Sequence, residues 1–278
     1  MKNFLIAVAA ILLPLALTAQ PKQYKIAAVG FYNLENLFDT INNPLTNDED
    51  FQPGGAYRYN TAVYVEKQAN LARVIADMGA EFTPDGAAIL GVAEVENRDV
   101  LEDLVRQKEI AGRNYQIVHY DSPDPRGIDV ALLYQPKYYT VTGSKTLPMV
   151  AYEENGVPRS TRDILLVSGI FDGDPLHVLV NHWPSRRGGE AATRPLRNAA
   201  ALVCKNVADS ITLADPMAKV IIMGDLNDDP VSPSVRQVLN AKAGKKDTQP
   251  RGFFNPFYDF FKKGIGTLAY QDSWNLFD

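Results

Sequence analysis

The chain has 278 residues, of which 46% are hydrophobic and 22% are charged, and its formal net charge at pH 7 is -5. This length and apolar content predict one domain with a large buried core, and no change in composition marks a linker. The negative charge excludes a protein that holds nucleic acid through an overall positive surface, so any anion site must be local. The only cysteine, Cys204, excludes an internal disulfide bond.

The first 19 residues have the pattern of a secretory signal peptide. Lys2 gives a positive start, residues 4 to 17 form an apolar run, and small residues precede Gln20. We therefore expect a secreted or periplasmic protein whose domain covers residues 20–278. An uncleaved membrane anchor is the alternative, but the run is shorter than the roughly 18 apolar residues of a membrane span. No later segment is long enough, so no membrane span is expected after signal cleavage.

A strand is predicted over residues 24 to 31, and the polar residues Asn33 and Glu35 follow it. Because side chains alternate along an extended segment, these two residues are expected on one face. An asparagine turn with a capping role is the alternative. Residues 40 to 60 predict a long surface loop, a kind of segment that often borders a functional site.

The next helix and strand deliver a second polar cluster. A helix from Thr61 is predicted to end before Gly79, with a buried stripe formed by Leu71, Val74, Ile75 and Met78. A buried strand over residues 87 to 92 then leads to Glu94 and Glu96. Burying both carboxylates together is costly without a cation, so Glu94 is the candidate and Glu96 is expected to be solvated. Asn97 or Asp99 is expected to cap a helix over residues 100 to 108.

Strands are predicted in succession over residues 115 to 121, 128 to 134, 138 to 147 and 164 to 171. Arg126 and Asp129 lie at the entry of the second of these strands, and Arg162 lies just before the last. An acidic residue in a buried strand needs a partner. Asp129 is therefore either paired with an arginine or hydrogen-bonded near a site.

The strand predicted over residues 175 to 182 ends at His182, immediately before a loop with Arg186, Arg187 and two glycines. Arginine side chains and backbone N–H groups in such a loop are suited to phosphate. His119 and His177 lack this setting and are interpreted as structural. A helix is predicted from Pro195, with a buried stripe formed by Leu196, Ala199, Ala200, Val203, Val207 and Ile211.

The run from Val220 to Met223 predicts a strand buried on both faces, and Gly224 lets the backbone leave the sheet. In an extended segment Asp225 and Asn227 point the same way. The carboxylate can hold a metal or orient a water, and the amide can donate to a phosphate oxygen. A strand end followed by an acidic turn is the alternative.

These motifs, in this order, resemble the endonuclease/exonuclease/phosphatase superfamily. They are the sequences around Asn33, Glu94, Asp129, His182 and Asp225: YNLEN, AEVEN, RGIDV, NHWPS and GDLN. The resemblance spans nearly the whole chain after the signal peptide. It implies an α+β fold, a four-layer α/β/β/α sandwich in which two packed mixed β-sheets are flanked by helices. The active site is then expected where several strand ends meet.

The resemblance also implies a phosphoester hydrolase that uses a divalent cation, commonly Mg²⁺, with Mn²⁺ or Ca²⁺ as alternatives. Glu94 is then the principal metal ligand, with Asn33 and Asp225 in the same pocket. Asp225 also orients the attacking water, Asn227 steadies that carboxylate and the phosphate, and His182 donates to the phosphoryl oxygens. Five further residues are expected to line the substrate site: Arg126, Asp129, Arg162, Arg186 and Arg187.

One departure from the family concerns its closing Ser-Asp-His motif, which does not follow Asn227 in this sequence. Either the sequence is truncated or the motif is naturally lost, so the domain is expected to lack its C-terminal strands and to hydrolyse poorly. The favoured function is that of a secreted monomeric endonuclease or phosphodiesterase. The alternatives are a phosphatase for a small phosphorylated molecule or a phospholipid head group, and a non-catalytic exported binding protein.

Overall fold

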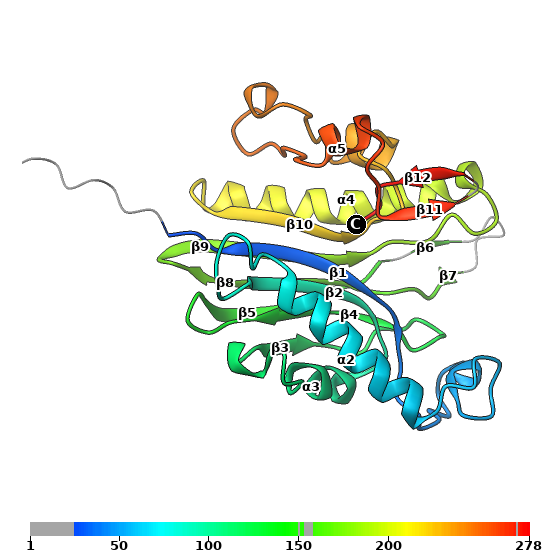
Figure 1. The fold of residues 1–278 in the computed structure, drawn as a ribbon. Helices are drawn as coiled ribbons and strands as arrows, with labels where there is room; N and C mark the ends of the chain where they lie inside the picture. Colours follow the sequence, from blue (N-terminus) through cyan, green and yellow to red (C-terminus); the bar gives the residue numbers. More distant parts are fainter. Residues whose placement is uncertain (1–24, 150, 153–157, 271) are drawn as a thin grey trace, which may run out of the picture.

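The computed structural model describes residues 25–149, 151–152, 158–270 and 272–278. The predicted signal peptide lies outside these residues. The described part is the expected α+β sandwich, in which two mixed sheets pack face to face and helices cover their outer faces (Figure 1). No helix within this part combines the length and the hydropathy that a membrane crossing needs.

The first large sheet has the strand order β1-β2-β4-β3. Its β1 and β2 are parallel, whereas β4 runs antiparallel to both of its neighbours. The bounds of the strands are β1 (Ala28–Leu37), β2 (Ala87–Val95), β3 (Gln116–His119) and β4 (Asp129–Tyr134).

The second large sheet has the order β10-β9-β8-β5, and only its β9 and β10 are parallel. Its strands are β5 (Tyr139–Leu147), β8 (Ile164–Phe171), β9 (Asp174–His182) and β10 (Lys219–Asp225). Two small antiparallel pairs are formed by β6 (Ala151–Tyr152) with β7 (Pro158–Arg159) and by β11 (Leu268–Tyr270) with β12 (Ser273–Asn275).

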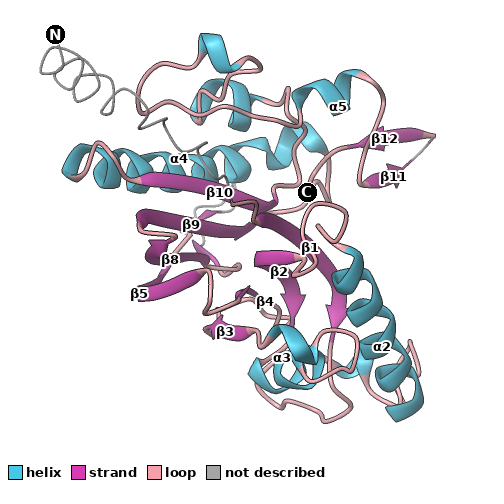
Figure 2. Ribbon diagram, turned by 60° about the vertical axis from the view of Figure 1, so that its left-hand side comes forward, coloured by secondary structure: helices cyan, strands magenta, loops and turns pink. Residues whose placement is uncertain are grey.

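Helices α2 (Thr61–Asp77) and α3 (Arg98–Val105) cover the first sheet, and the long helix α4 (Glu190–Ala214) covers the second (Figure 2). A C-terminal lobe contains the short helix α5 (Tyr258–Lys262) and the β11–β12 hairpin. The remaining helical turns are at Glu49–Phe51, Ala111–Arg113, Ser234–Val238 and Lys245–Asp247.

Three groups of buried side chains fill the three spaces between the four layers. Leu90 and Leu133 belong to the group under α2 and α3, and Leu179 and Cys204 to the group under α4. Between the sheets, Ile89 and Leu132 of the first sheet face Val178 and Val180 of the second. Because successive strand residues point to opposite faces, each central strand contributes to two of these groups.

Several boundaries differ from the sequence predictions. The first strand continues through Leu37 instead of ending at residue 31, because β2 offers it a parallel partner that far. The run from Val220 to Met223 is only partly buried, not buried on both faces, because β10 is an edge strand of its sheet.

The buried faces of two helices agree with the predictions only in part. In α2, Leu71 and Ile75 are buried as predicted, but Gln68 and Ala72 complete the buried face and Val74 is exposed. Helix α4 begins at Glu190 rather than Pro195, and its fully buried face includes Arg197, Ala201 and Ala208. The predicted apolar residues Leu196, Val203, Val207 and Ile211 are only partly buried beside this face. The prediction found Ala200 on this face but missed most of the other residues, because they are small, or charged as at Arg197.

Candidate active site

Glu94 is positioned by a bulge in β2. Between Ala93 and Val95 the pairing with β4 advances by one residue only, from Val130 to Asp129, so Glu94 is the extra residue. Its φ of 59° lies in the left-handed region, which non-glycine residues adopt rarely and often at functional sites. Such a bulge re-aims a side chain. The direction of the Glu94 side chain is therefore set by the bulge and not by the regular alternation of a strand.

Asn33 lies just before a second irregularity, in β1, where residues 34 to 36 interrupt the pairing with β2. Its side chain makes two hydrogen bonds. The amide nitrogen donates to Asp225 Oδ2 at 3.2 Å, and the amide oxygen accepts from the Glu35 backbone N–H at 2.9 Å. Glu35 has a φ of 52° and is exposed. The asparagine turn offered as an alternative from the sequence is thus present, and Asn33 also reaches the predicted site.

Asp225 and Asn227 stand at the end of β10, as predicted. The Asn227 backbone N–H donates to Asp225 Oδ1 at 2.9 Å, and the Asn227 side chain donates to the Trp183 carbonyl at 3.0 Å. Burial raises the pKa of Asp225 to about 7, and the negative charges of Asp278 and Glu94 add to this shift. The carboxyl group is therefore held in a position that disfavours its charge unless a cation is present.

His182 lies between the carboxylates of the two sheets. Its Nε2 is 3.7 Å from Glu94 Oε1 and 3.7 Å from Asp225 Oδ2, and its buried Nδ1 has no hydrogen-bond partner among the described residues. Burial, followed by the positive charges of Arg162 and Arg126, lowers the pKa of His182 well below its usual value. A neutral imidazole in this place carries one N–H donor beside two carboxylates.

Two residues at the site were missed from the sequence. Asp278 has a buried Oδ1 that finds no hydrogen-bond partner in the part of the chain that the structure describes, and burial raises its pKa. Lys67, on α2, donates to the Glu35 carbonyl at 2.7 Å, and burial lowers its pKa against the charges of Glu35 and Glu94. Asp278 directly follows two apolar residues, and this pattern could have indicated it from the sequence. Lys67 gives no such signal, because its role depends on where α2 lies.

The donor set fits a hard divalent cation. Glu94 and Asp225 offer carboxylate oxygens, the kind of ligand that Mg²⁺, Mn²⁺ and Ca²⁺ prefer, whereas the Asn33 oxygen accepts from the Glu35 N–H in this structure. The orphaned Asp278 Oδ1 and the raised pKa of Asp225 show an excess of buried negative charge at this place. A cation is the compensation that such a cluster needs.

Arg162 precedes β8 of the second sheet and Arg126 precedes β4 of the first, and the two side chains differ in exposure. Arg162 is buried and donates to the His182 carbonyl at 3.2 Å, the Trp183 carbonyl at 2.8 Å and Asp124 Oδ2 at 2.8 Å. Arg126 leaves its side chain 48% exposed beside Asp124 and contributes positive charge at His182. Of these two predicted substrate-binding residues, Arg126 is the more exposed to an anion from solvent, because the Arg162 side chain is only 8% exposed.

Arg186 and Arg187 are adjacent in the sequence but differ in their contacts. Arg186 donates to the Asn227 carbonyl at 2.9 Å, forms ion pairs with Asp228 and Asp229, and lies 4.5 Å from the centre of the Phe277 ring. Its guanidinium holds the loop after β10 in place. Arg187 is exposed and forms no ion pair within the described residues.

Asp129 and Glu96 lie beside the site in roles of their own. Among the described residues no arginine pairs with Asp129; its carboxylate accepts from the Ser122 N–H at 2.8 Å and contacts His119 Nε2 at 3.0 Å. Asp121 lies close enough to complete a possible cation cluster with them.

The expectation that Glu96 is solvated is wrong, because Glu96 is buried, accepts from the Asp39 N–H at 2.6 Å and has its pKa raised to about 7 chiefly by burial. Asn97 caps α3 through the Val100 N–H, as one of the two predicted caps.

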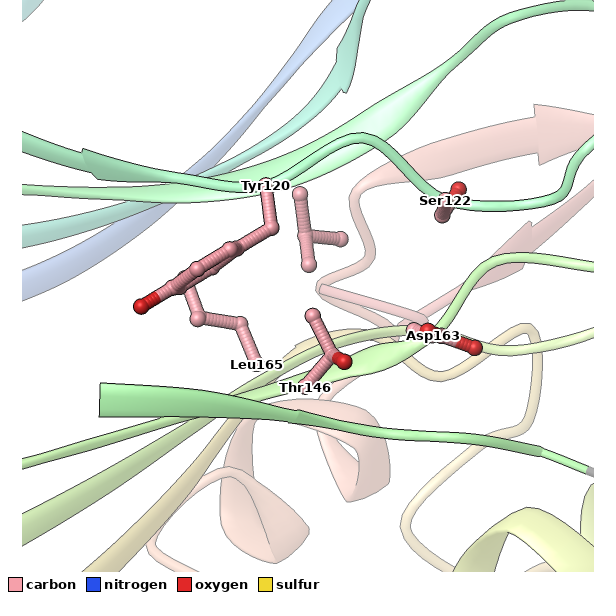
Figure 3. Close-up of a pocket in the computed structure, with 6 residues that line it drawn as sticks. Tyr120, Ser122, Thr146, Asp163 and Leu165 are labelled. Atoms are coloured by element: carbon pink, nitrogen blue, oxygen red, sulfur yellow. The ribbon is translucent and has the colours of Figure 1, made fainter.

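A small pocket lies between the two sheets near Asp129 (Figure 3). Tyr120 and Ser122 line it from one side, and Thr146, Asp163 and Leu165 from the other. Its volume of about 10 Å³ is on the scale of a single water molecule. This pocket is therefore too small for a phosphoester, and the convergence at Glu94, Asp225 and His182 remains the candidate site.

Comparison with solved structures gives matches of low identity. Truncated TDP2 of Caenorhabditis elegans is 22% identical over 58% of this chain and 57% of that chain, with a TM-score of 0.42. The catalytic domain of human nocturnin with bound sulfate is 17% identical over 63% of each chain, with a TM-score of 0.46. A mannosyl-6-phosphatase of Bacteroides thetaiotaomicron is 15% identical over 78% of this chain and 70% of that chain, with a TM-score of 0.49.

The chain thus spans less than two thirds of the length of the first two proteins. No curated protein matches the sequence. A family model matches residues 28–278, a range that contains every residue of the candidate site. The chain belongs to the endonuclease/exonuclease/phosphatase family.

Proposed function

We propose that this protein is a metal-dependent phosphoester hydrolase, and specifically a secreted or periplasmic, monomeric endonuclease or phosphodiesterase. The observation that carries the proposal is the meeting of Glu94 and Asp225, which come from different sheets, within 3.7 Å of His182 Nε2. Family membership supports the hydrolase class. The pattern of an export signal in the first 19 residues supports the location.

In this proposal each residue has a distinct role. Asp225, fixed by Asn33 and the Asn227 N–H, orients the attacking water toward phosphorus. The P–O bond to the water forms as the P–O bond to the leaving group breaks. The neutral His182 donates its N–H to a phosphoryl oxygen, where negative charge gathers. Arg126 and Arg187 have free donors for neighbouring phosphate oxygens.

A divalent cation, with Mg²⁺ as the first choice, would be held by Glu94, Asn33 and Asp225. When bound, it would offset the negative charge on the phosphoryl oxygens. The chain's own contribution is to fix these donors before binding, through the bulge at Glu94 and the hydrogen bond from Asn33 to Asp225.

A phosphatase that acts on a small phosphorylated molecule or a phospholipid head group is the second candidate. The net charge of -5 favours it over any enzyme that must hold a long duplex. A non-catalytic exported binding protein on the same scaffold is the third, since a fold alone does not determine activity.

The test is hydrolysis of DNA, RNA, a nucleotide, a sugar phosphate and a phospholipid, each in Mg²⁺, in Mn²⁺ and in excess chelator. We expect cleavage of nucleic acid that requires the cation and is lost in Glu94→Gln, with an unchanged circular dichroism spectrum. Glu66→Gln, an exposed change on α2, is the matched control. Undiminished turnover in chelator or in Glu94→Gln would refute the metal-dependent assignment, and cleavage of small phosphoesters alone would refute the nuclease.

A further inference from the structure

We propose that His119, Asp121 and Asp129 form a second metal site, separate from the candidate active site, which takes Zn²⁺. One ligand atom from each residue, an imidazole nitrogen or a carboxylate oxygen, lies within 4.8 Å of the other two. A mixed set of nitrogen and oxygen ligands favours Zn²⁺ over Mg²⁺ and Ca²⁺, which take oxygen ligands almost alone. None of these three residues has a role in the proposed hydrolysis.

The three ligands meet on one face of the first sheet. His119 ends β3 and pairs with Ala131 of β4, which is buried on the face that α2 and α3 cover. Asp129 precedes Ala131 by two residues, so its side chain is directed to the same face. Asp121 follows His119 by two residues and is directed there as well. Tyr120, between them, points the other way, into the small pocket between the sheets (Figure 3).

The distance between the two buried ligands fits a single ion. His119 Nε2 lies 3.0 Å from Asp129 Oδ2, and each of these side chains is only 3% exposed. Two ligand atoms about 2.1 Å from one Zn²⁺ are roughly 3.0 to 3.4 Å apart, depending on the angle between them. Zn²⁺ can therefore take the place of a proton on Nε2 with little movement of either group, and that proton leaves to the solvent. The Ser122 N–H, which donates to Asp129 Oδ1 at 2.8 Å, fixes the carboxylate for this contact.

The charges at this place favour a divalent cation over a simple ion pair. Within the described residues neither Asp121 nor Asp129 forms an ion pair with a lysine or an arginine. A protonated His119 would neutralise one of the two carboxylates and leave the other as a like charge beside it, whereas Zn²⁺ neutralises both. A third carboxyl group is near, because the charge of Asp129 adds to the burial that raises the pKa of Asp163. Asp121 is exposed, so an ion can reach the buried pair from solvent.

An ion at this place would stabilise the loop between β3 and β4. His119 and Asp121 precede residues 122–128 of this loop and Asp129 follows them, so one ion holds both ends of the loop. The loop carries Arg126, a candidate substrate-binding residue whose side chain is 48% exposed. A loop that is already fixed presents this guanidinium to an anion without the cost of ordering it on binding.

The experiment is a calorimetric titration of Glu94→Gln with Zn²⁺ in excess Mg²⁺, a background in which the candidate active site has lost a carboxylate. We expect one Zn²⁺ to bind per chain. His119→Ala in this background should weaken the affinity by more than about tenfold, since even the loss of a group that only orients a ligand costs about 10- to 100-fold. Asp121→Asn should weaken it as well, and its exposed position means that no core packing is lost.

NMR of the imidazole nitrogens locates the ion, because the chain has three histidines. Zn²⁺ should shift the ring signals of His119 and remove the proton from its Nε2, and it should leave His177 and His182 unchanged. His177→Gln is the matched control: its ring nitrogen lies 2.8 Å from Ser168 Oγ, and its loss should leave Zn²⁺ binding as it is.

Thermal unfolding checks that each variant is folded. Absence of Zn²⁺ binding, an unchanged affinity in both His119→Ala and Asp121→Asn, or shifts confined to His182 would overturn the proposal. Because every titration is made in Glu94→Gln and no turnover is measured, the outcome is separate from the hydrolysis test of the proposed function.

Discussion

At the scale of single residues, the surroundings of Asp225 both disfavour and stabilise the charged form of its carboxyl group. Burial and the charges of Asp278 and Glu94 raise its pKa to about 7, whereas the Asn227 N–H and the Asn33 amide stabilise its charged form. A carboxyl that only supported the fold would be cheaper if it were neutral or absent. We propose that a ligand that needs the charge offsets this cost at the strand end beside Glu94 and His182.

This conflict predicts how the stability of the metal-free protein changes with pH. The native pKa of Asp225 is above the ordinary 3.8, so between these values the native state binds more protons than the unfolded state. Stability from this group is therefore fully present below about pH 4 and is lost as the pH rises through about 7. Urea unfolding in chelator across this range should show the decline, and Asp225→Asn should make it shallower. An equally steep decline in Asp225→Asn would contradict the assignment.

Lys67 gives a second prediction at this scale. Its ammonium group lies beside Glu35 and Glu94, and no carboxylate within the described residues forms an ion pair with it. We expect Lys67→Met to raise KM for a phosphodiester about tenfold, as the loss of one charge-assisted hydrogen bond would do. Separate measurement of kcat and KM checks this, with Lys108→Met as the control. A fall in stability with KM unchanged would instead indicate a structural role.

At the scale of elements, the sequence predicted which strands exist more reliably than how their ends are shaped. Apolar runs and the glycine after Met223 were enough to place Asp225 and His182 at strand ends. The bulge at Glu94 and the irregularity after Asn33 could not be predicted, because a bulge depends on the register of the partner strand. Arg186 and Arg162 were assigned to substrate by residue type, whereas their contacts depend on loops brought together only by folding.

A substitution at Gly224 tests how closely β9 and β10 must pack. It pairs with Asn181 at a φ of 144°, and a Cβ there would lie 2.1 Å from the Asn181 carbonyl oxygen. Gly224→Ala must push these strands apart or twist the backbone beside Asp225, so we expect a loss of about 1–3 kcal/mol in unfolding free energy. Gly143→Ala in β5 is the matched control, since a Cβ there meets nothing within 4 Å. Equal denaturation midpoints for the two variants would show that the close approach is relieved without cost.

At the scale of the whole molecule, the site exists only when the two sheets are packed together. Glu94 and Asn33 come from the first sheet, Asp225 and His182 from the second, and Val178 and Leu132 belong to the buried layer between them. The order of motifs along the chain indicated this convergence only through the family resemblance. Composition and periodicity alone could not, because they do not specify which strand ends share an edge.

A cation bound across the two sheets should therefore stabilise the whole fold. A ligand at 100 times its Kd adds about 2.7 kcal/mol to the native state. For a domain of this size each kcal/mol raises Tm by about 2–4 °C, so saturating Mg²⁺ should raise Tm by at least about 5 °C over chelator. Calorimetry of Glu94→Gln should show a much smaller rise, while Glu66→Gln keeps it. If instead Glu94→Gln keeps the full rise and His119→Ala loses it, the stabilising cation is bound by His119, Asp121 and Asp129, and the two sheets are not joined by metal at the active site.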